Sequence, residues 1–120
     1  MTRTRIKICG LTREADVDAA VAAGADAIGF VLYPKSPRFV TPERAAELAR
    51  RLPPFVTPVL LFVNENAINI EAACARVAGA AMQFHVMNQP PTVWLSHVPP
   101  AARSCVPRAF PHRPPRCPTW

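Results

Sequence analysis

An alternation of two sequence patterns along the first 85 residues constrains the fold of this chain more than any other feature. Short apolar runs rich in β-branched residues predict strands, and runs whose apolar residues recur every three or four positions predict helices. The predicted strands are residues 5–9, 26–32, 58–63 and 81–85, and the predicted helices begin near residues 12, 41 and 68. Short apolar strands that alternate with helices are typical of a parallel sheet covered by helices.

Two threonines are predicted to begin helices. Thr41 is followed by Pro42 and Glu43, which places a capping hydroxyl, a proline and an acid at the start of a helix that extends towards residue 52. Thr12 is predicted to cap the preceding helix. The apolar face of that helix is predicted to contain Val17, Ala20, Val21 and Gly24.

Two architectures begin with this order of elements, the doubly wound sheet and the (β/α)8 barrel. The periodicity by itself does not choose between them. The glycine-rich loops that hold phosphates in many doubly wound proteins, and the G-x-S-x-G turn of hydrolases, are not found in the sequence. A dinucleotide-binding sheet therefore lacks its usual sequence support.

The composition changes after His85, which divides the chain into two predicted parts, residues 1–85 and residues 86–120. The first part contains all eight acids, all four glycines and ten of the 14 lysines and arginines. The second part contains nine of the 15 prolines, the other four arginines, and no acid or glycine. A folded domain is predicted for the first part and a disordered Pro/Arg-rich tail for the second. The net charge of +2 on the first part is too small to indicate a nucleic-acid or membrane partner.

The four cysteines include no C-x-x-C pair, which gives little reason to expect a disulfide or a metal site. The first residues lack an apolar stretch of signal-peptide length, and no apolar run reaches the roughly 18–20 residues of a membrane span. We therefore expect reduced thiols and a cytoplasmic protein.

Polar or reactive residues follow three predicted strands, at the sheet edge where α/β proteins place their sites. They are Cys9, Arg38 in a proline-rich loop, and residues 64–66. Strand alternation puts Lys7 on the face of Cys9, and a nearby lysine favours the thiolate that a base or nucleophile needs. Arg38 can hold a carboxylate or phosphate through two hydrogen bonds. The alternatives are a small buried hydrophobic residue for Cys9, a solvated surface residue for Arg38, and a structural or merely exposed histidine for His85.

Four short motifs stand out within residues 3–85. They are Lys7-Ile8-Cys9-Gly10-Leu11-Thr12, Gly29-Phe30-Val31, Ser36–Pro42 and Gln83-Phe84-His85. In order and spacing they resemble phosphoribosylanthranilate isomerases. The resemblance implies a (β/α)8 barrel and an intramolecular oxidoreductase of tryptophan biosynthesis that uses no metal or organic cofactor. It implies an Amadori rearrangement of a phosphorylated substrate, N-(5-phosphoribosyl)anthranilate, to 1-(2-carboxyphenylamino)-1-deoxyribulose 5-phosphate.

The same resemblance implies roles for single residues. Cys9 matches the general base that takes the proton from ribose C2, and Arg38 matches the arginine that holds the anthranilate carboxylate. Lys7, beside Cys9, is a further candidate for substrate binding. The general acid of the family, an aspartate at a later strand end, has no counterpart in this chain, and neither do the phosphate-binding loops after the seventh and eighth strands.

The match ends at His85, where the family continues with Gly-Asp-Glu and this chain reads Val86-Met87-Asn88. If one G is restored directly after the His85 codon, the next three codons encode Gly, Asp and Glu. The Asp requires that the Val86 codon is GTG. We therefore expect residues 86–120 to be an out-of-frame translation. Only the first half of a barrel then remains, with two unpaired strand edges, so we expect no isomerase activity and a tendency to self-associate.

The alternative is a non-enzymatic half-barrel fragment with an interaction tail. Residues 111–116 fit the P-x-x-P-x-R pattern of polyproline ligands, and the charge of +4 on the tail suits acidic partners. Because such matches arise easily in a proline-rich reading frame, the isomerase half is the favoured interpretation.

Overall fold

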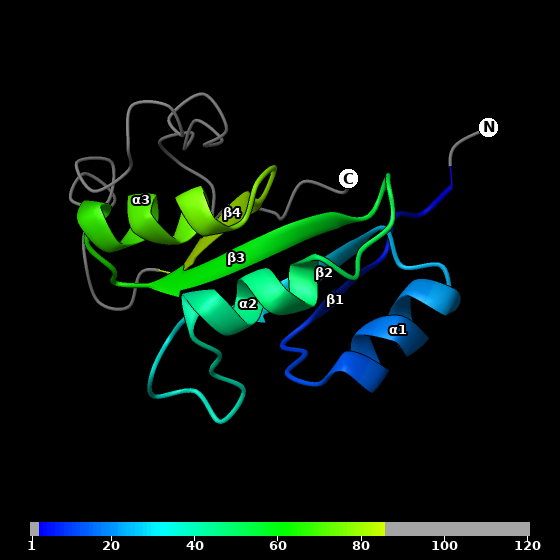
Figure 1. The fold of residues 1–120 in the computed structure, drawn as a ribbon, viewed down its shortest axis with the longest axis horizontal. Helices are drawn as coiled ribbons and strands as arrows, with labels where there is room; N and C mark the ends of the chain where they lie inside the picture. The colour runs from blue at the N-terminus through cyan, green and yellow to red at the C-terminus, as the bar shows by residue number, and fades with distance from the viewer. Residues whose placement is uncertain (1–2, 86–120) are drawn as a thin grey trace, which may run out of the picture.

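The computed structural model describes residues 3–85, in which four strands alternate with three helices (Figure 1). The elements in chain order are β1 (Lys7–Cys9), α1 (Glu14–Ala22), β2 (Ala27–Val31), α2 (Pro42–Ala49), β3 (Thr57–Val63), α3 (Ala67–Arg76) and β4 (Ala81–His85). The predicted order of strands and helices is confirmed. The tail and its polyproline pattern lie outside the described residues.

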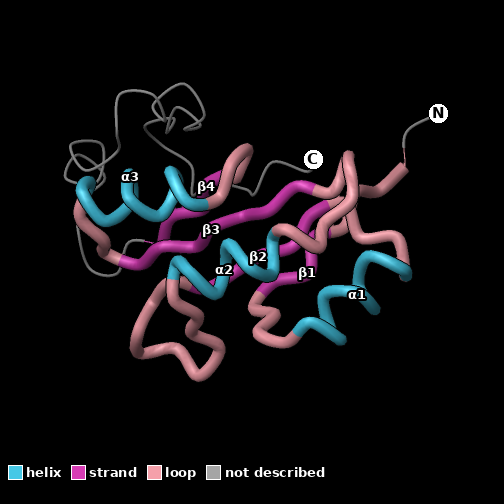
Figure 2. Tube along the Cα trace, viewed as in Figure 1, coloured by secondary structure: helices cyan, strands magenta, loops and turns pink. Residues whose placement is uncertain are grey.

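The strands form one parallel sheet in the order β1-β2-β3-β4, so neighbours in sequence are also neighbours in space. Connections between parallel strands are right-handed, and an unbroken strand order therefore places every connecting helix on the same side of the sheet. Figures 1 and 2 show α1, α2 and α3 on one side of the sheet. This is the arrangement of a barrel wall, whereas a doubly wound sheet reverses its strand order and carries helices on both sides.

The helix-covered side of the sheet, here called the core face, carries the larger part of the hydrophobic core. Its strand residues are Ile28, Phe30, Leu60 and Phe62, each at most 2% exposed. The helices pack Val17, Ala45, Leu48, Ile70 and Ala73 into the same cluster. Burial of these side chains is the main force that holds the helices on the sheet.

The opposite side of the sheet, here called the site face, carries the residues that alternate with those of the core face. Strand register places Cys9 beside Gly29, Gly29 beside Val59, and Leu61 beside Gln83. Lys7 and His85 lie on the same face and are exposed, whereas Cys9, Leu61 and Gln83 are half-buried. None of the helices within residues 3–85 packs against this face.

The prediction that Thr12 caps the first helix is wrong. Arg13 is the N-cap, in extended conformation and without a side-chain capping bond, so Thr12 lies one residue before the N-cap. Gly24 lies beyond the helix end, with a φ of 92°. Thr41 does cap α2, because its hydroxyl accepts a hydrogen bond from the Arg44 amide at 3.2 Å.

The second helix also ends earlier than its sequence pattern predicts. α2 stops at Ala49, and the amides of Arg51 and Leu52 bond to carbonyls only three residues back. These bonds make a tighter turn that leads into the prolines at 53 and 54. No helix within residues 3–85 is long and apolar enough to cross a membrane.

Candidate active site

Cys9 ends β1 on the site face, and its side chain lies against the backbone of the next strand. Gly29 is its partner in the strand register. A Cβ built on Gly29 would lie 2.8 Å from Cys9 Sγ and 3.2 Å from both Cα and Cβ of Cys9. The sulfur therefore occupies space that any other residue at position 29 would fill.

Arg38 belongs to the long loop between β2 and α2, which folds back along the end of β2. The Phe39 amide donates to the Ser36 carbonyl, and the Arg38 amide lies 3.2 Å from Ser36 Oγ. The Val40 amide then donates to the Val31 carbonyl at 2.9 Å, which extends the sheet by one bridge. These bonds bring the Arg38 side chain back to the strand ends although the loop itself is exposed.

The structure brings Arg38 and Cys9 together. Arg38 Nη1 donates to the Cys9 carbonyl oxygen at 3.4 Å. Gly10 lies beneath the guanidinium, with a φ of 82°, and a Cβ there would lie 2.7 Å from Arg38 Nη1. Gly10 thus serves both a left-handed turn and the close approach of Arg38. The guanidinium remains exposed at the edge of the sheet where β1 ends.

Lys7 lies on the predicted face, and the hydrogen bond that it makes is with Gln83 of β4. The amide nitrogen of Gln83 lies 3.1 Å from His85 Nε2. Because an ammonium only donates, the Gln83 oxygen must face Lys7 and its NH2 must donate to His85 Nε2.

The Lys7–Gln83 contact also shows that the sheet is curved. The strand register aligns Lys7 with Thr57 of β3 and Gln83 with Leu61, four residues further along. In a flat sheet the two residues would therefore lie about 14 Å apart across the strands and about 13 Å apart along them, about 19 Å in all, which is beyond the combined reach of the two side chains. The site face is therefore concave. The motif Gln83-Phe84-His85 does not by itself indicate a role for Gln83. Its link to Lys7 depends on the curvature of the sheet, which the sequence pattern does not reveal.

The third predicted strand end, residues 64–66, serves local structure. Asn66 caps α3 by accepting a bond from the Asn69 amide at 2.8 Å. Glu65 Oε1 accepts bonds from the Asn66 amide and from Asn69 Nδ2. The Asn64 amide donates to the His85 carbonyl. These contacts account for the polar residues at this position without a ligand.

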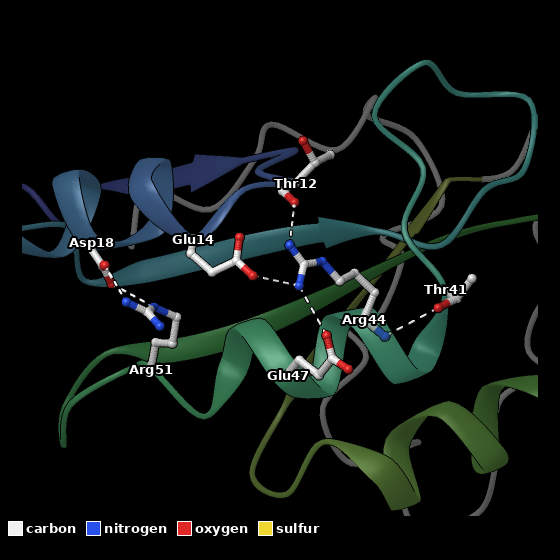
Figure 3. A network of polar contacts seen from close by, with 7 residues as sticks. All are labelled: Thr12, Glu14, Asp18, Thr41, Arg44, Glu47 and Arg51. Carbon is white, nitrogen blue, oxygen red and sulfur yellow. Dashed lines mark hydrogen bonds and ion pairs between the residues drawn. The ribbon is translucent and has the colours of Figure 1, made fainter.

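A network of ion pairs holds the loop after β1 to the helices behind it (Figure 3). Arg44 Nη1 of α2 lies 2.7 Å from Glu14 of α1 and 3.0 Å from Glu47. Arg44 Nη2 donates to the Thr12 carbonyl at 3.4 Å. The hydrogen bond from Arg44 lowers the pKa of Glu14 to about 2. The network therefore connects α2, which follows the Arg38 loop, with the loop that contains Gly10.

Two free thiols, Cys9 and Cys74, lie within the described residues. Burial raises the pKa of the Cys74 thiol, which lies in α3 away from the site face. Within residues 3–85, no group of three or more histidines, cysteines, aspartates or glutamates is arranged to hold a metal ion.

Comparison with known proteins identifies the family. The family model described as "N-(5'phosphoribosyl)anthranilate (PRA) isomerase" matches residues 6–107. The N-(5'-phosphoribosyl)anthranilate isomerases of Methylibium petroleiphilum and Dechloromonas aromatica are 69% and 66% identical to this chain over 83 residues, 69% of its length. The chain spans only 39% and 40% of the lengths of these two relatives.

A solved structure agrees with the sequence relatives. It is a phosphoribosyl anthranilate isomerase in complex with reduced 1-(o-carboxyphenylamino)-1-deoxyribulose 5-phosphate, and it superimposes with a TM-score of 0.71 at 41% identity. The superposition covers 78% of this chain and 48% of that one. Since the family model matches most of the sequence and the fold agrees, the chain belongs to the N-(5'-phosphoribosyl)anthranilate (PRA) isomerase family.

Proposed function

We propose that residues 3–85 form the first half of a phosphoribosylanthranilate isomerase site, with Cys9 as general base and Arg38 as the clamp on the anthranilate carboxylate. The observation that supports this most is the 3.4 Å contact between Arg38 Nη1 and the Cys9 carbonyl. It places a guanidinium, whose planar fork suits a carboxylate, beside the strand end that carries the thiol. The proposed substrate is a phosphorylated small molecule. We also propose that the protein is located in the cytoplasm.

The proposed chemistry moves hydrogen within one substrate. The bond between C1 and the ring oxygen breaks, the ring oxygen takes up a proton, and C1 becomes an imine carbon. The Cys9 thiolate then removes the proton from C2, the C2 hydroxyl loses its proton to become a carbonyl, and C1 is protonated, so an aldose derivative becomes a ketose derivative with no external oxidant. A base of this kind contributes typically about 10²–10⁴-fold to the rate. Lys7 is proposed to assist substrate binding from the same face. Its link to Gln83 holds the ammonium on the concave side of the sheet.

The matching acid is the missing part of this scheme. Residues 86–120 contain no aspartate or glutamate, and the chain spans about two fifths of the length of its curated relatives. We propose that these residues are translated out of frame and that the 120-residue chain has no isomerase turnover of its own. Resequencing the codons for Gln83 to Gln89 tests the frame directly, since a G after the His85 codon would restore the family sequence.

A chimera tests whether residues 1–85 contain a working half-site. It joins these residues to the remaining part of the Methylibium petroleiphilum isomerase, which is 69% identical over the matched region. We expect the chimera to isomerise N-(5-phosphoribosyl)anthranilate. A folded chimera without turnover would contradict the proposal.

Within the chimera, Arg38→Lys tests the carboxylate clamp. The lysine keeps the charge but loses the planar fork, so we expect KM to rise by about 10-fold or more, the equivalent of a lost charged hydrogen bond. Arg50→Lys, an exposed arginine at the end of α2, is the matched control and should leave KM unchanged. Equal effects of the two variants would argue against the clamp.

A second candidate function, self-association, is favoured by the edge strand β1. Ile6 is 47% exposed and Ile8 is 38% exposed beside this edge, on the side that faces the core. We propose that β1 of one copy pairs with β4 of another. Sedimentation equilibrium should then show a dimer for the chain and a monomer for Ile8→Lys, and a monomer in both cases would contradict this proposal.

A further inference from the structure

We propose that Gly29 is a positioning residue, which sets the place of the Cys9 sulfur. Because Gly29 has no side chain, the sulfur lies directly against the backbone of β2, and this space above Gly29 is here called the seat of the sulfur. The inference deepens the proposed function and rests on it only for the catalytic consequence. The placement of the thiol itself is tested without any isomerase activity.

The space above Gly29 explains why this glycine differs from its neighbours. It lies in the middle of β2 and is buried, and its backbone is ordinary strand rather than a left-handed turn. Conformational freedom therefore does not explain a glycine here, where a strand interior disfavours one. What remains is the contact across the register, where a Cβ would stand 2.8 Å from Cys9 Sγ.

A methyl group at position 29 would force the sulfur to move. The sulfur is the end of a short side chain with three staggered positions about χ1, and a change from one to another moves it by about 3 Å. The seat over Gly29 keeps Cys9 half-buried. With the seat filled, the sulfur would turn towards the concave site face, where Lys7 and His85 are exposed.

The displaced sulfur should react faster with iodoacetamide. In the full 120-residue chain we expect Gly29→Ala to accelerate labelling of Cys9 about 10-fold, the equivalent of about 1.4 kcal/mol. Peptide mapping distinguishes Cys9 from the other cysteines. The half-buried Cys74 serves as an internal reference and should keep its rate.

Gly24→Ala is the matched control. Gly24 has a φ of 92°, so alanine there is strained, but a Cβ would have no neighbour within 4 Å. This variant therefore introduces a glycine-to-alanine cost without a contact at Cys9, and its labelling rates should equal those of the parent chain. An unchanged Cys9 rate in Gly29→Ala would overturn the proposal. Equal acceleration of Cys9 and Cys74 would also overturn it, because that pattern indicates general loosening.

A double-mutant cycle keeps the test decisive if Gly29→Ala unfolds the chain. Cys9→Ala removes the 2.8 Å contact with the sulfur but keeps the 3.2 Å contacts with Cα and Cβ, so the stability cost of Gly29→Ala should shrink in that background without vanishing. The double variant should therefore be more stable than Gly29→Ala alone. An undiminished cost would overturn the proposal.

In the chimera, Gly29→Ala should lower kcat by about 100-fold with little change in KM, as expected for a base displaced by more than 1 Å. An inactive parent chimera would count against the proposed function and leave the labelling result standing.

Discussion

The two faces of the sheet differ most clearly at neighbouring residues of β3. Leu60 points into the core face and is fully buried, whereas Leu61 points to the site face and is half-buried. The same contrast separates Phe30 and Phe62 on the core face from Cys9 and Gln83 on the site face. One strand thus contributes to two environments, because successive side chains point to opposite sides.

The contrast indicates that the two faces of the sheet in residues 3–85 contribute to different properties, stability and chemistry. The core face holds the helices through apolar packing, and the site face carries a thiol, a lysine, an amide and a histidine around a concave surface. Substitutions on the core face should act on stability, and substitutions on the site face should act on chemistry.

Leu60→Ala and Leu61→Ala form a pair of equal chemistry on opposite faces. We expect Leu60→Ala to lower the free energy of unfolding by about 2–5 kcal/mol, because a fully buried side chain leaves a cavity. Leu61→Ala should cost roughly half of that or less, since its side chain is already partly in water. Urea denaturation of both variants measures the difference. Equal losses of unfolding free energy in the two variants would show that side chains on the site face are shielded from water to the same extent as those on the core face.

Thr41→Ala and Thr12→Ala compare a capping threonine with one outside a helix. Loss of the bond from the Arg44 amide should destabilise α2 and cost about 1 kcal/mol. Thr12 lies before the N-cap and contributes its backbone carbonyl, which alanine retains, so we expect less than about 0.5 kcal/mol there. Thermal unfolding of the two variants decides the comparison, and a larger cost for Thr12→Ala would refute it.

Acid should weaken the contact between α1 and α2 that Arg44 and Glu14 make. The pKa of Glu14 is about 2 in the folded chain, below its ordinary value of 4.5. A lowered pKa stabilises the fold above the ordinary value, and this contribution is lost as pH falls from about 4.5 to about 2. Urea midpoints should therefore fall over this range, and Arg44→Gln should make the decline shallower. Because both side chains of the pair are partly exposed to water, the effect should be small and should weaken in salt. A decline of equal slope in Arg44→Gln would contradict this assignment.

Much of the fold could be predicted from the sequence, because local patterns determine its elements. The apolar runs of β2 and β3 and the start of α2 at Thr41 each depend on residues close in the chain. The start of α1 could not be placed, because the extended conformation of Arg13 overrides a good capping residue at Thr12. A pattern of residue types does not reveal that choice.

The residues of the candidate site could be predicted from the sequence, but the contacts between them could not. Cys9 and Arg38 follow from their places after two strands, but the contact between them depends on how the loop folds back over Gly10. The Lys7–Gln83 bond depends on sheet curvature, and the seat at Gly29 depends on strand register. Both of these are properties of the assembled sheet.

If the site face carries isomerase chemistry and the core face carries stability, Cys9→Ala should separate the two. We would measure the kcat of the chimera before and after this substitution. We expect kcat to fall by about 10²–10⁴-fold while the free energy of unfolding changes by less than about 1 kcal/mol. A Cys9→Ala chimera that retains its kcat would contradict the account, because the thiol at the end of β1 would then have no part in the reaction.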